Sequence, residues 1–359
     1  MDYIRLNDKK IRVDDFLNTT HQAANLKFIS QFIDDWFKLT EEYSFKTSGS
    51  TGEPKSIRLS RNQLDYSAAS TLSELGLHKS HGEALLVIPA DRIGGTMLIV
   101  RSLLSNIDLH IAEPTADFTF LDRKYVLTSI TPYQLDSLVR NHPKKLRLFE
   151  NILVGGGPLD SELEQKCIEL SNANCNIYHT YGMTETASHV ALRKLGSKEF
   201  KAIGDANFSM DNRSCLRITG TITKKRALTT NDIVQLIDSK SFIWKGRADF
   251  VINTGGIKIS PEAVEEKLGP QLGTFNFFVA GVPDDKLGEK VVLIIEANQH
   301  EAIPAIDLSV IGKYARPKTI YLLPAFAFTD SGKIDRSKTM DSLHLKNVKL
   351  IPKQNKKQR

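Results

Sequence analysis

The sequence predicts an α/β protein: a large N-terminal α/β domain with mostly parallel sheets, followed by a small α+β domain. Three observations support this fold class. Short apolar segments such as ALLVIP, YVLTSI and NILVGGGP alternate with helical patterns such as LDSELEQKCIELSNA, as buried parallel strands and their connecting helices do. A chain of 359 residues has room for about two domains. Near residue 246 the alternation gives way to short strands around single helices.

The individual elements follow in chain order. Residues 21–39 carry apolar residues at helical spacing and predict the first long helix. The strand-like segment IRLS precedes a helix that begins at Ser60, because Ser60 and Gln63 match a capping box. After residue 246, the sequence Ser-Pro-Glu at 260–262 starts a helix that we expect to close at Gly269. FNFFVAGV and KVVLIIEA then predict two strands around a turn.

These elements predict an N-terminal domain over residues 1–246, a C-terminal domain over residues 247–341 and a basic tail over residues 342–359. Six lysine and arginine residues of the tail account for the whole formal net charge of +6. Such a tail is typical of a disordered, solvated terminus. Because no aromatic residues alternate with its charges, we expect no nucleic-acid partner.

Composition narrows the class of protein further. No apolar run reaches the ~18 residues that a membrane-spanning helix needs, and the polar N-terminal residues of mixed charge match no targeting peptide. Three cysteines without a CxxC pair indicate neither a disulfide framework nor a zinc site. We therefore expect a cytoplasmic protein without an integral membrane segment, and composition leaves its oligomeric state open.

The segment KTSGSTGEPK at residues 46–55 is the richest candidate site. Its glycines expose backbone amides, its hydroxyls add donors and Lys55 adds charge, which suits a triphosphate. An ordinary flexible loop has a similar composition. A Walker A loop does not fit, because Pro54 replaces its second glycine and a strand, rather than a helix, follows.

TSGSTGEPK resembles the signature loop of the adenylate-forming superfamily of acyl- and aryl-CoA synthetases. Further segments resemble the superfamily's other motifs in the expected order, from residue 45 to about residue 336. They are GGGP at 155–158, HTYGMTET at 179–186, TND at 230–232, GRAD at 246–249, GGIKISPE at 255–262 and TDSGKIDR at 329–336. Taken singly, each also fits an ordinary turn or loop. Together they imply an AMP-forming acid–CoA ligase that uses ATP, Mg²⁺ and coenzyme A.

The resemblance also implies roles for individual residues. The ATP and AMP site comprises Thr47, Ser48, Gly49, Ser50, Thr51, Gly52, Lys55, Gly156, Gly157, Tyr181, Gly182, Asp232 and Arg247. The catalytic residues are Lys333, Thr184 and Glu185, and the Glu185 carboxylate also suits Mg²⁺ as a hard oxygen ligand. Gly255 and Gly256 belong to a strand that lines the CoA tunnel, and Asp249 marks the hinge between the domains.

Tyr181 offers a flat ring for adenine, and the Asp232 carboxylate can accept bonds from both ribose hydroxyls. Two departures from the superfamily pattern stand out. Asn231 replaces the usual glycine, and we expect it to keep the turn because asparagine tolerates a left-handed backbone. Only forty-six residues precede the phosphate loop, so we expect the first subdomain to be truncated.

The segment IPADRIGGT with the following Arg101 looks most like the o-succinylbenzoate–CoA ligases of menaquinone biosynthesis. That substrate has two carboxylates, and Arg92, Arg101 and His189 are candidates to bind the one that is not activated. Each could equally be a surface or helix-capping charge. Another aryl- or acyl-CoA synthetase and a non-catalytic AMP- or acyl-binding relative are the alternative functions.

Overall fold

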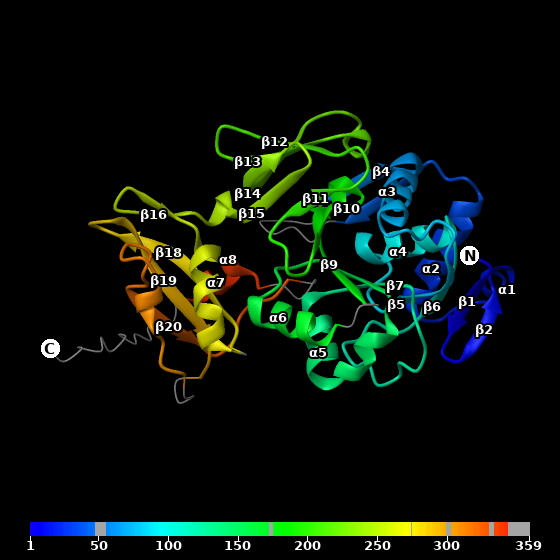
Figure 1. Cartoon of the computed structure of the whole chain (residues 1–359), viewed down its shortest axis with the longest axis horizontal. Coiled ribbons are helices and arrows are strands. Elements are labelled where there is room, and N and C mark those ends of the chain that lie inside the picture. The colour runs from blue at the N-terminus through cyan, green and yellow to red at the C-terminus, as the bar shows by residue number, and fades with distance from the viewer. Residues whose placement is uncertain (47–54, 172–174, 274, 299–302, 330–333, 344–359) are drawn as a thin grey trace.

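The computed structural model describes residues 1–46, 55–171, 175–273, 275–298, 303–329 and 334–343. A 13-stranded mixed sheet organises the larger part of the chain, and a five-stranded sheet organises the part after Arg247 (Figure 1). The strand order of the large sheet is β12-β13-β14-β15-β11-β10-β9-β8-β7-β5-β6-β1-β2. The predicted α/β class is confirmed.

The parallel half of this sheet contains the alternating elements that the sequence predicts. Its strands are β5 (His81–Leu86), β6 (Asn106–Ile111), β7 (Leu127–Ile130), β8 (Asn151–Val154) and β9 (Asn176–Met183). The helices between them are α4 (Ile93–Leu103), α5 (Pro132–Asn141) and α6 (Ser161–Leu170), with the 3₁₀ helix η1 (Pro143–Leu148). Ala84 and Leu86 pack into one apolar core and Leu85 into another, so β5 is covered on both faces.

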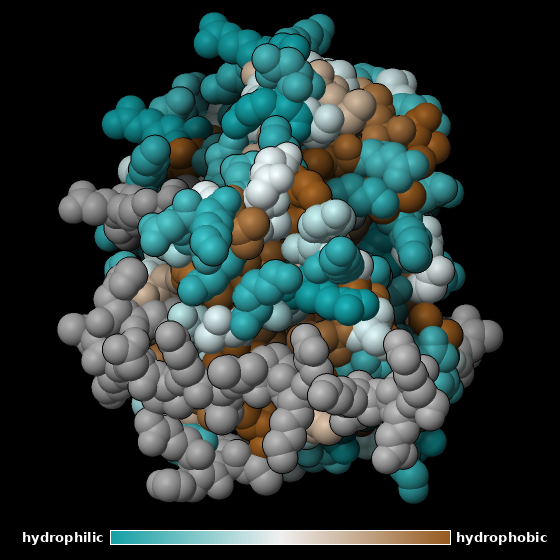
Figure 2. Space-filling model, turned by 90° about the vertical axis from the view of Figure 1, so that its left-hand side faces the viewer, coloured by the Kyte–Doolittle hydropathy of each residue, from teal (hydrophilic) through white to brown (hydrophobic). Residues whose placement is uncertain are grey.

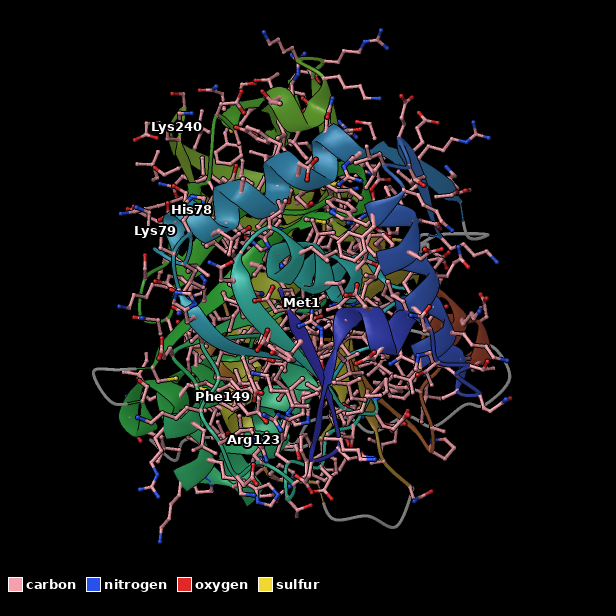
Figure 3. All side chains as sticks on the ribbon, turned by 90° about the vertical axis from the view of Figure 1, so that its right-hand side faces the viewer. Met1, His78, Lys79, Arg123, Phe149 and Lys240 are labelled. Atoms are coloured by element: carbon pink, nitrogen blue, oxygen red, sulfur yellow. The ribbon has the colours of Figure 1, made fainter. Side chains whose placement is uncertain are left out.

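The N-terminal residues extend one edge of the sheet. β1 (Tyr3–Leu6) pairs in parallel with β6 and antiparallel with β2 (Lys9–Arg12). The Met1 amino group donates to the Ser105 carbonyl at 2.7 Å, so the described N-terminus is attached to the sheet edge (Figure 3). Helices α1 (Val13–Leu17) and α2 (Ala24–Phe37) follow, and α2 lies within the predicted range 21–39.

A separate hairpin leads into helix α3. β3 (Glu42–Lys46) pairs with β4 (Ser56–Ser60), and α3 (Arg61–Glu74) begins directly afterwards. Ser60 caps α3, and the backbone N–H of Gln63 and the Gln63 side chain complete the predicted capping box.

The other half of the large sheet is antiparallel. It comprises β10 (Ser188–Lys194), β11 (Phe200–Ala202), β12 (Asn207–Met210), β13 (Cys215–Thr219), β14 (Leu228–Asp238) and β15 (Ser241–Arg247). The short 3₁₀ helices η2 (Thr184–Thr186) and η3 (Thr221–Thr223) interrupt the path between strands. β9 lies where the parallel and antiparallel halves meet, near the middle of the molecule (Figure 1).

The C-terminal sheet contains β16 (Ile252–Thr254), β17 (Ile257–Ile259), β18 (Phe277–Asp284), β19 (Gly288–Glu296) and β20 (Thr319–Leu323). The 3₁₀ helices η4 (Ala248–Phe250) and η5 (Leu308–Val310) and the helices α7 (Pro261–Leu272) and α8 (Arg336–Leu343) accompany it. Figure 2 shows the outward face of this part, which is largely hydrophilic with smaller hydrophobic areas. β18 and β19 match the two predicted strands.

Three sequence predictions in this region are wrong in detail. α7 does not close at Gly269 but continues through Pro270 to Leu272 and ends at Gly273, whose φ of 57° suits a helix terminus. Gly255 and Gly256 form a two-residue hairpin turn between β16 and β17, with φ of 57° and 80°, rather than a strand. α8 ends at Leu343, two residues into the predicted tail; residues 344–359 lie outside the described chain.

No helix among the described residues is long and apolar enough to cross a membrane.

Buried neutral histidines make the fold sensitive to acid. The His110 side chain is buried, and its Nδ1 lies 2.7 Å from the Tyr125 hydroxyl. Burial lowers the pKa of His110 to about 4, well below the ordinary value of 6.5. Between these two values the unfolded chain binds a proton that the folded protein does not, so the free energy of unfolding falls as the pH falls.

We expect the substitution His110→Gln to weaken this acid sensitivity. The difference in free energy of unfolding between pH 7 and pH 5, measured by urea denaturation, should shrink by about 2 kcal/mol, because one protonation costs ~1.4 kcal/mol per pH unit. His78→Gln is the matched control, since His78 is exposed after α3 (Figure 3). An unchanged pH dependence in the His110 variant would contradict the expectation.

Candidate active site

The candidate site is centred on the end of β9. The Tyr181 hydroxyl donates to Asp232 Oδ2 at 2.7 Å, and the Tyr181 ring packs edge-on against Phe242 at 5.0 Å. Burial, and then the Asp232 carboxylate, raise the pKa of Tyr181 well above its ordinary value. The hydroxyl therefore stays protonated and holds the carboxylate in place. At Gly182 a Cβ would collide with the Ser188 backbone, so the tight approach of β10 requires glycine.

Asp232 lies on β14, opposite Arg247 on β15. Besides Tyr181, Trp244 Nε1 donates to Asp232 Oδ1 at 3.2 Å, and Arg247 Nη1 lies 3.8 Å from the same oxygen. The side chain is mostly buried, so its oxygens have a defined orientation. The expected left-handed turn at Asn231 is wrong, because residues 230–232 continue the extended strand β14 and pairing with β15 replaces the turn.

Trp244 was not predicted from the sequence. Its contact with Asp232 depends on the pairing of β14 with β15, where a register shift between Ile233 and Val234 places Trp244 opposite Val234. A regular alternation of residues along either strand does not reveal a contact that depends on such irregularities.

Arg247 and Asp249 form an ion pair where the large sheet ends. Arg247 also places its guanidinium near the Phe250 ring of η4. On the same stretch of β15, Glu262 and Ser260 from the start of α7 lie over Gly246, where a Cβ would meet the Glu262 carboxylate at 2.5 Å. The predicted hinge residue Asp249 therefore lies in η4, directly after the stretch of β15 that contacts the start of α7.

Thr184 and Glu185 form η2 directly after β9. Glu185 is partly exposed, and its carboxylate makes no hydrogen bond or ion pair with any residue that the structure describes. The described residues hold no group of three or more metal-ligating side chains. One unpaired carboxylate fits Mg²⁺, which takes only one or two protein ligands when it bridges phosphates.

The glycine turn at 155–157 lies against β9. His179 Nε2 lies 3.1 Å from the Gly157 carbonyl, and a Cβ at Gly155 would meet Thr180 Oγ1 at 2.5 Å. Gly156 has a φ of 88°, which a residue with a side chain rarely adopts. The contacts of Gly155 and Gly157 therefore hold this turn beside β9, the strand that carries Tyr181.

Part of the predicted site lies outside the described residues. This applies to Thr47, Ser48, Gly49, Ser50, Thr51 and Gly52 of the phosphate loop and to Lys333. The hairpin that holds the loop is described: Lys46 pairs with Ser56, and the Ser44 and Ser56 hydroxyls are 2.7 Å apart. β4 of this hairpin lies against η2, the element that carries Glu185.

The structure separates the three candidate substrate residues. Arg101 on α4 is buried beside His189 on β10. Arg92 is the N-cap of α4, about 13 Å along the helix axis from Arg101. The three residues therefore do not form one cluster, and Arg92 is removed from the other two.

Arg101 is unusual among the buried residues. Its Nε and Nη2 have no hydrogen-bond partner in the described chain, and no described carboxylate forms an ion pair with it. Burial lowers its pKa to about 9, so it remains charged at neutral pH. Burial, followed by this charge, lowers the pKa of His189 well below its ordinary value. A neutral His189, hydrogen-bonded to Thr71 at 2.9 Å, lies next to an uncompensated cation.

Comparison with known proteins identifies the family of the chain. The family model described as AMP-binding enzyme matches residues 44–213. A solved structure from Dyadobacter fermentans, an acyl-CoA synthetase (AMP-forming)/AMP-acid ligase II-like protein, is 33% identical with a TM-score of 0.58, covering 91% of this chain and 97% of that one. The chain belongs to the AMP-binding enzyme family.

Two more relatives of this AMP-binding enzyme are informative. The 2-succinylbenzoate–CoA ligase of Listeria monocytogenes is 28% identical, over 81% of this chain and 68% of its own length. The o-succinylbenzoate CoA synthetase of Bacillus subtilis, solved with an acyl-adenylate intermediate, is 20% identical with a TM-score of 0.72, covering 87% of this chain and 70% of that one. The latter likeness supports the two-domain adenylate-forming fold.

Proposed function

We propose that this AMP-binding enzyme is an ATP-dependent acid–CoA ligase that converts 2-succinylbenzoate to its CoA thioester in menaquinone biosynthesis. The observation that carries the reaction is the arrangement of Tyr181, Asp232 and Glu185 around the end of β9. The Tyr181 ring can stack on adenine, the Asp232 carboxylate can accept hydrogen bonds from the ribose hydroxyls, and Glu185 can bind the metal ion at the phosphates. The named relatives support the substrate.

The reaction has an electrostatic problem, because a carboxylate must attack the α-phosphorus of the ATP polyanion. As the new P–O bond forms, the bond to the β-phosphate oxygen breaks and its electron pair leaves with pyrophosphate. Mg²⁺ supplies charge neutralisation at the phosphates when it is bound. In our proposal Glu185 holds that ion, Thr184 donates to the α-phosphate, and Lys333 and the phosphate-loop residues stabilise the developing charge.

Arg101 supports a dicarboxylic acid as the substrate. A buried guanidinium without an anion costs free energy, and a carboxylate is its natural partner. We assign Arg101 to the second carboxylate, with the neutral His189 beside it. The cavity that His189 lines is only about 10 Å³, room for about one water, so in our proposal the substrate reaches Arg101 only after a local opening of this region.

We further propose that residues 1–246 and 247–341 act as separate domains, that Asp249 is the hinge and that Gly255 and Gly256 border the CoA path. In this proposal the contact between α7 and β15 belongs to one of two orientations of the C-terminal domain. The adenylate forms in one orientation, and the CoA thiol reaches it in the other. ATP and coenzyme A are supplied in the cytoplasm, where we place the protein.

We expect Asp249→Pro to separate the two half-reactions. Proline fixes φ near −65°, and the lost carboxylate removes the ion pair with Arg247, so one domain position is trapped. Adenylate formation and thioester formation from supplied adenylate should then change by different factors, measured by pyrophosphate and AMP release. Asp249→Asn controls for the lost charge alone. A proline variant with both rates unchanged would place the hinge elsewhere.

A coupled assay tests the proposed function. Purified protein with ATP, Mg²⁺, CoA and 2-succinylbenzoate should release AMP and pyrophosphate and form a thioester. Benzoate and octanoate in the same assay should react at least tenfold more slowly. Preference for a monocarboxylate would overturn the substrate but not the chemistry, and absence of AMP with every acid would overturn the enzymatic function.

A further inference from the structure

A second feature of the site is an open groove beside Glu185, with a volume of about 190 Å³. This is more than ten times the ~10–15 Å³ that a cavity needs to hold one water. The groove lies where the start of α3, η2, η3 and the start of β14 meet. Its lining residues are Gln63, Glu185, Ile222, Thr223, Lys224, Arg226, Ala227 and Leu228.

Hydrogen bonds fix the wall of the groove that carries Lys224 and Arg226. Gln63 Nε2 donates to the Ile222 carbonyl at 2.7 Å and so attaches η3 to α3. After η3, Lys224 and Lys225 both adopt a left-handed backbone, with φ of 52° and 59°, and their amides bond back to Thr221 and Gly220. This turn places Lys224 and Arg226 in the lining and leaves Lys225 out of it.

The charges of the groove do not neutralise one another. Lys224 and Arg226 are exposed, and neither forms an ion pair with any described residue, Glu185 included. A bare polyanion would be attracted by the two cations and repelled by the carboxylate. A polyanion that carries a divalent cation can interact favourably with both kinds of group. The metal ion is attracted by the Glu185 carboxylate, and the free phosphate oxygens accept hydrogen bonds from Lys224 and Arg226.

We infer that this groove binds pyrophosphate as its magnesium complex, the product that leaves when the adenylate forms. The inference rests on the proposed function, which supplies pyrophosphate directly beside Glu185. Lys224 and Arg226 receive the phosphate oxygens as the bond to the α-phosphorus breaks. The groove is therefore a product site that lies next to the nucleotide and is separate from the adenine and ribose contacts.

Calorimetric titration of pyrophosphate into the full-length protein tests this without any turnover. Wild-type protein should bind pyrophosphate with Mg²⁺ present and more weakly without it. Lys224→Ala and Arg226→Ala should each weaken binding by up to about fivefold, the upper end of the range for exposed charge pairs, and the double variant by the product of the two factors. Lys225→Ala is the matched control and should bind as wild type does.

Product inhibition gives the second readout. The inhibition constant for pyrophosphate in the forward reaction should rise by the same factors in the two groove variants, while KM for ATP changes by less than twofold. An equal rise in KM for ATP would overturn the product site in favour of a triphosphate subsite. Unchanged pyrophosphate affinity in both groove variants, or an equal loss of affinity in Lys225→Ala, would also overturn the product site. Normal pyrophosphate release during turnover of those variants would show that the ligase function stands independently of it.

Discussion

Replacing Lys333 by alanine is expected to lower the rate of adenylate formation by about 10²–10³-fold, the usual effect of removing one group that stabilises transition-state charge. Transfer of a preformed acyl-adenylate to CoA should be much less affected, because no phosphate charge develops in that step. Pyrophosphate release measures the first half-reaction, and thioester formation from synthetic adenylate measures the second.

Lys338→Ala is the control for this experiment. Lys338 lies on α8 close to Lys333 in sequence and is exposed, and among the described residues its side chain makes only a 3.6 Å ion pair with Asp335. It should keep both rates. Equal losses in both half-reactions of the Lys333 variant would show that the lysine supports the fold rather than the chemistry.

The second large effect is expected at Arg101. Arg101→Met keeps the length of the side chain but removes the charge, and should lower kcat/KM for 2-succinylbenzoate by about 10²-fold through lost charge-assisted bonds. For a substrate analogue without the second carboxylate, the one that is not activated, the same substitution should change kcat/KM little. Arg101→Lys should retain part of the activity, since it keeps the charge without the two-pronged geometry.

A stability measurement distinguishes this role from a structural one. Arg101 is buried without a described partner, so its removal should leave the melting temperature of the free protein unchanged or raise it. 2-Succinylbenzoate should raise the melting temperature of wild type more than that of the variant. A large drop in the melting temperature of Arg101→Met, with equal losses on both substrates, would refute recognition by Arg101.

The local elements and the family were predictable from the sequence, because their signals lie within a few neighbouring residues. Ser60 and Gln63 are three residues apart, and their capping box requires nothing from the rest of the chain. The continuous apolar run at Ala84, Leu85 and Leu86 likewise indicated a strand buried on both faces, and the side chains do pack alternately into two cores. The ordered motifs led to the AMP-binding family for the same reason, since each is a short continuous segment.

The tertiary structure decided which distant residues meet. No local pattern distinguished Arg101 from Arg92. Only the packing of α4 beside β10 brings Arg101 to His189 and away from carboxylates of the described chain. Strand pairing replaced the expected turn at Asn231 and brought Trp244 to Asp232. The groove beside Glu185 combines α3, η2 and η3, which lie far apart in sequence. Such contacts depend on long-range packing and register, which no local pattern of residues encodes.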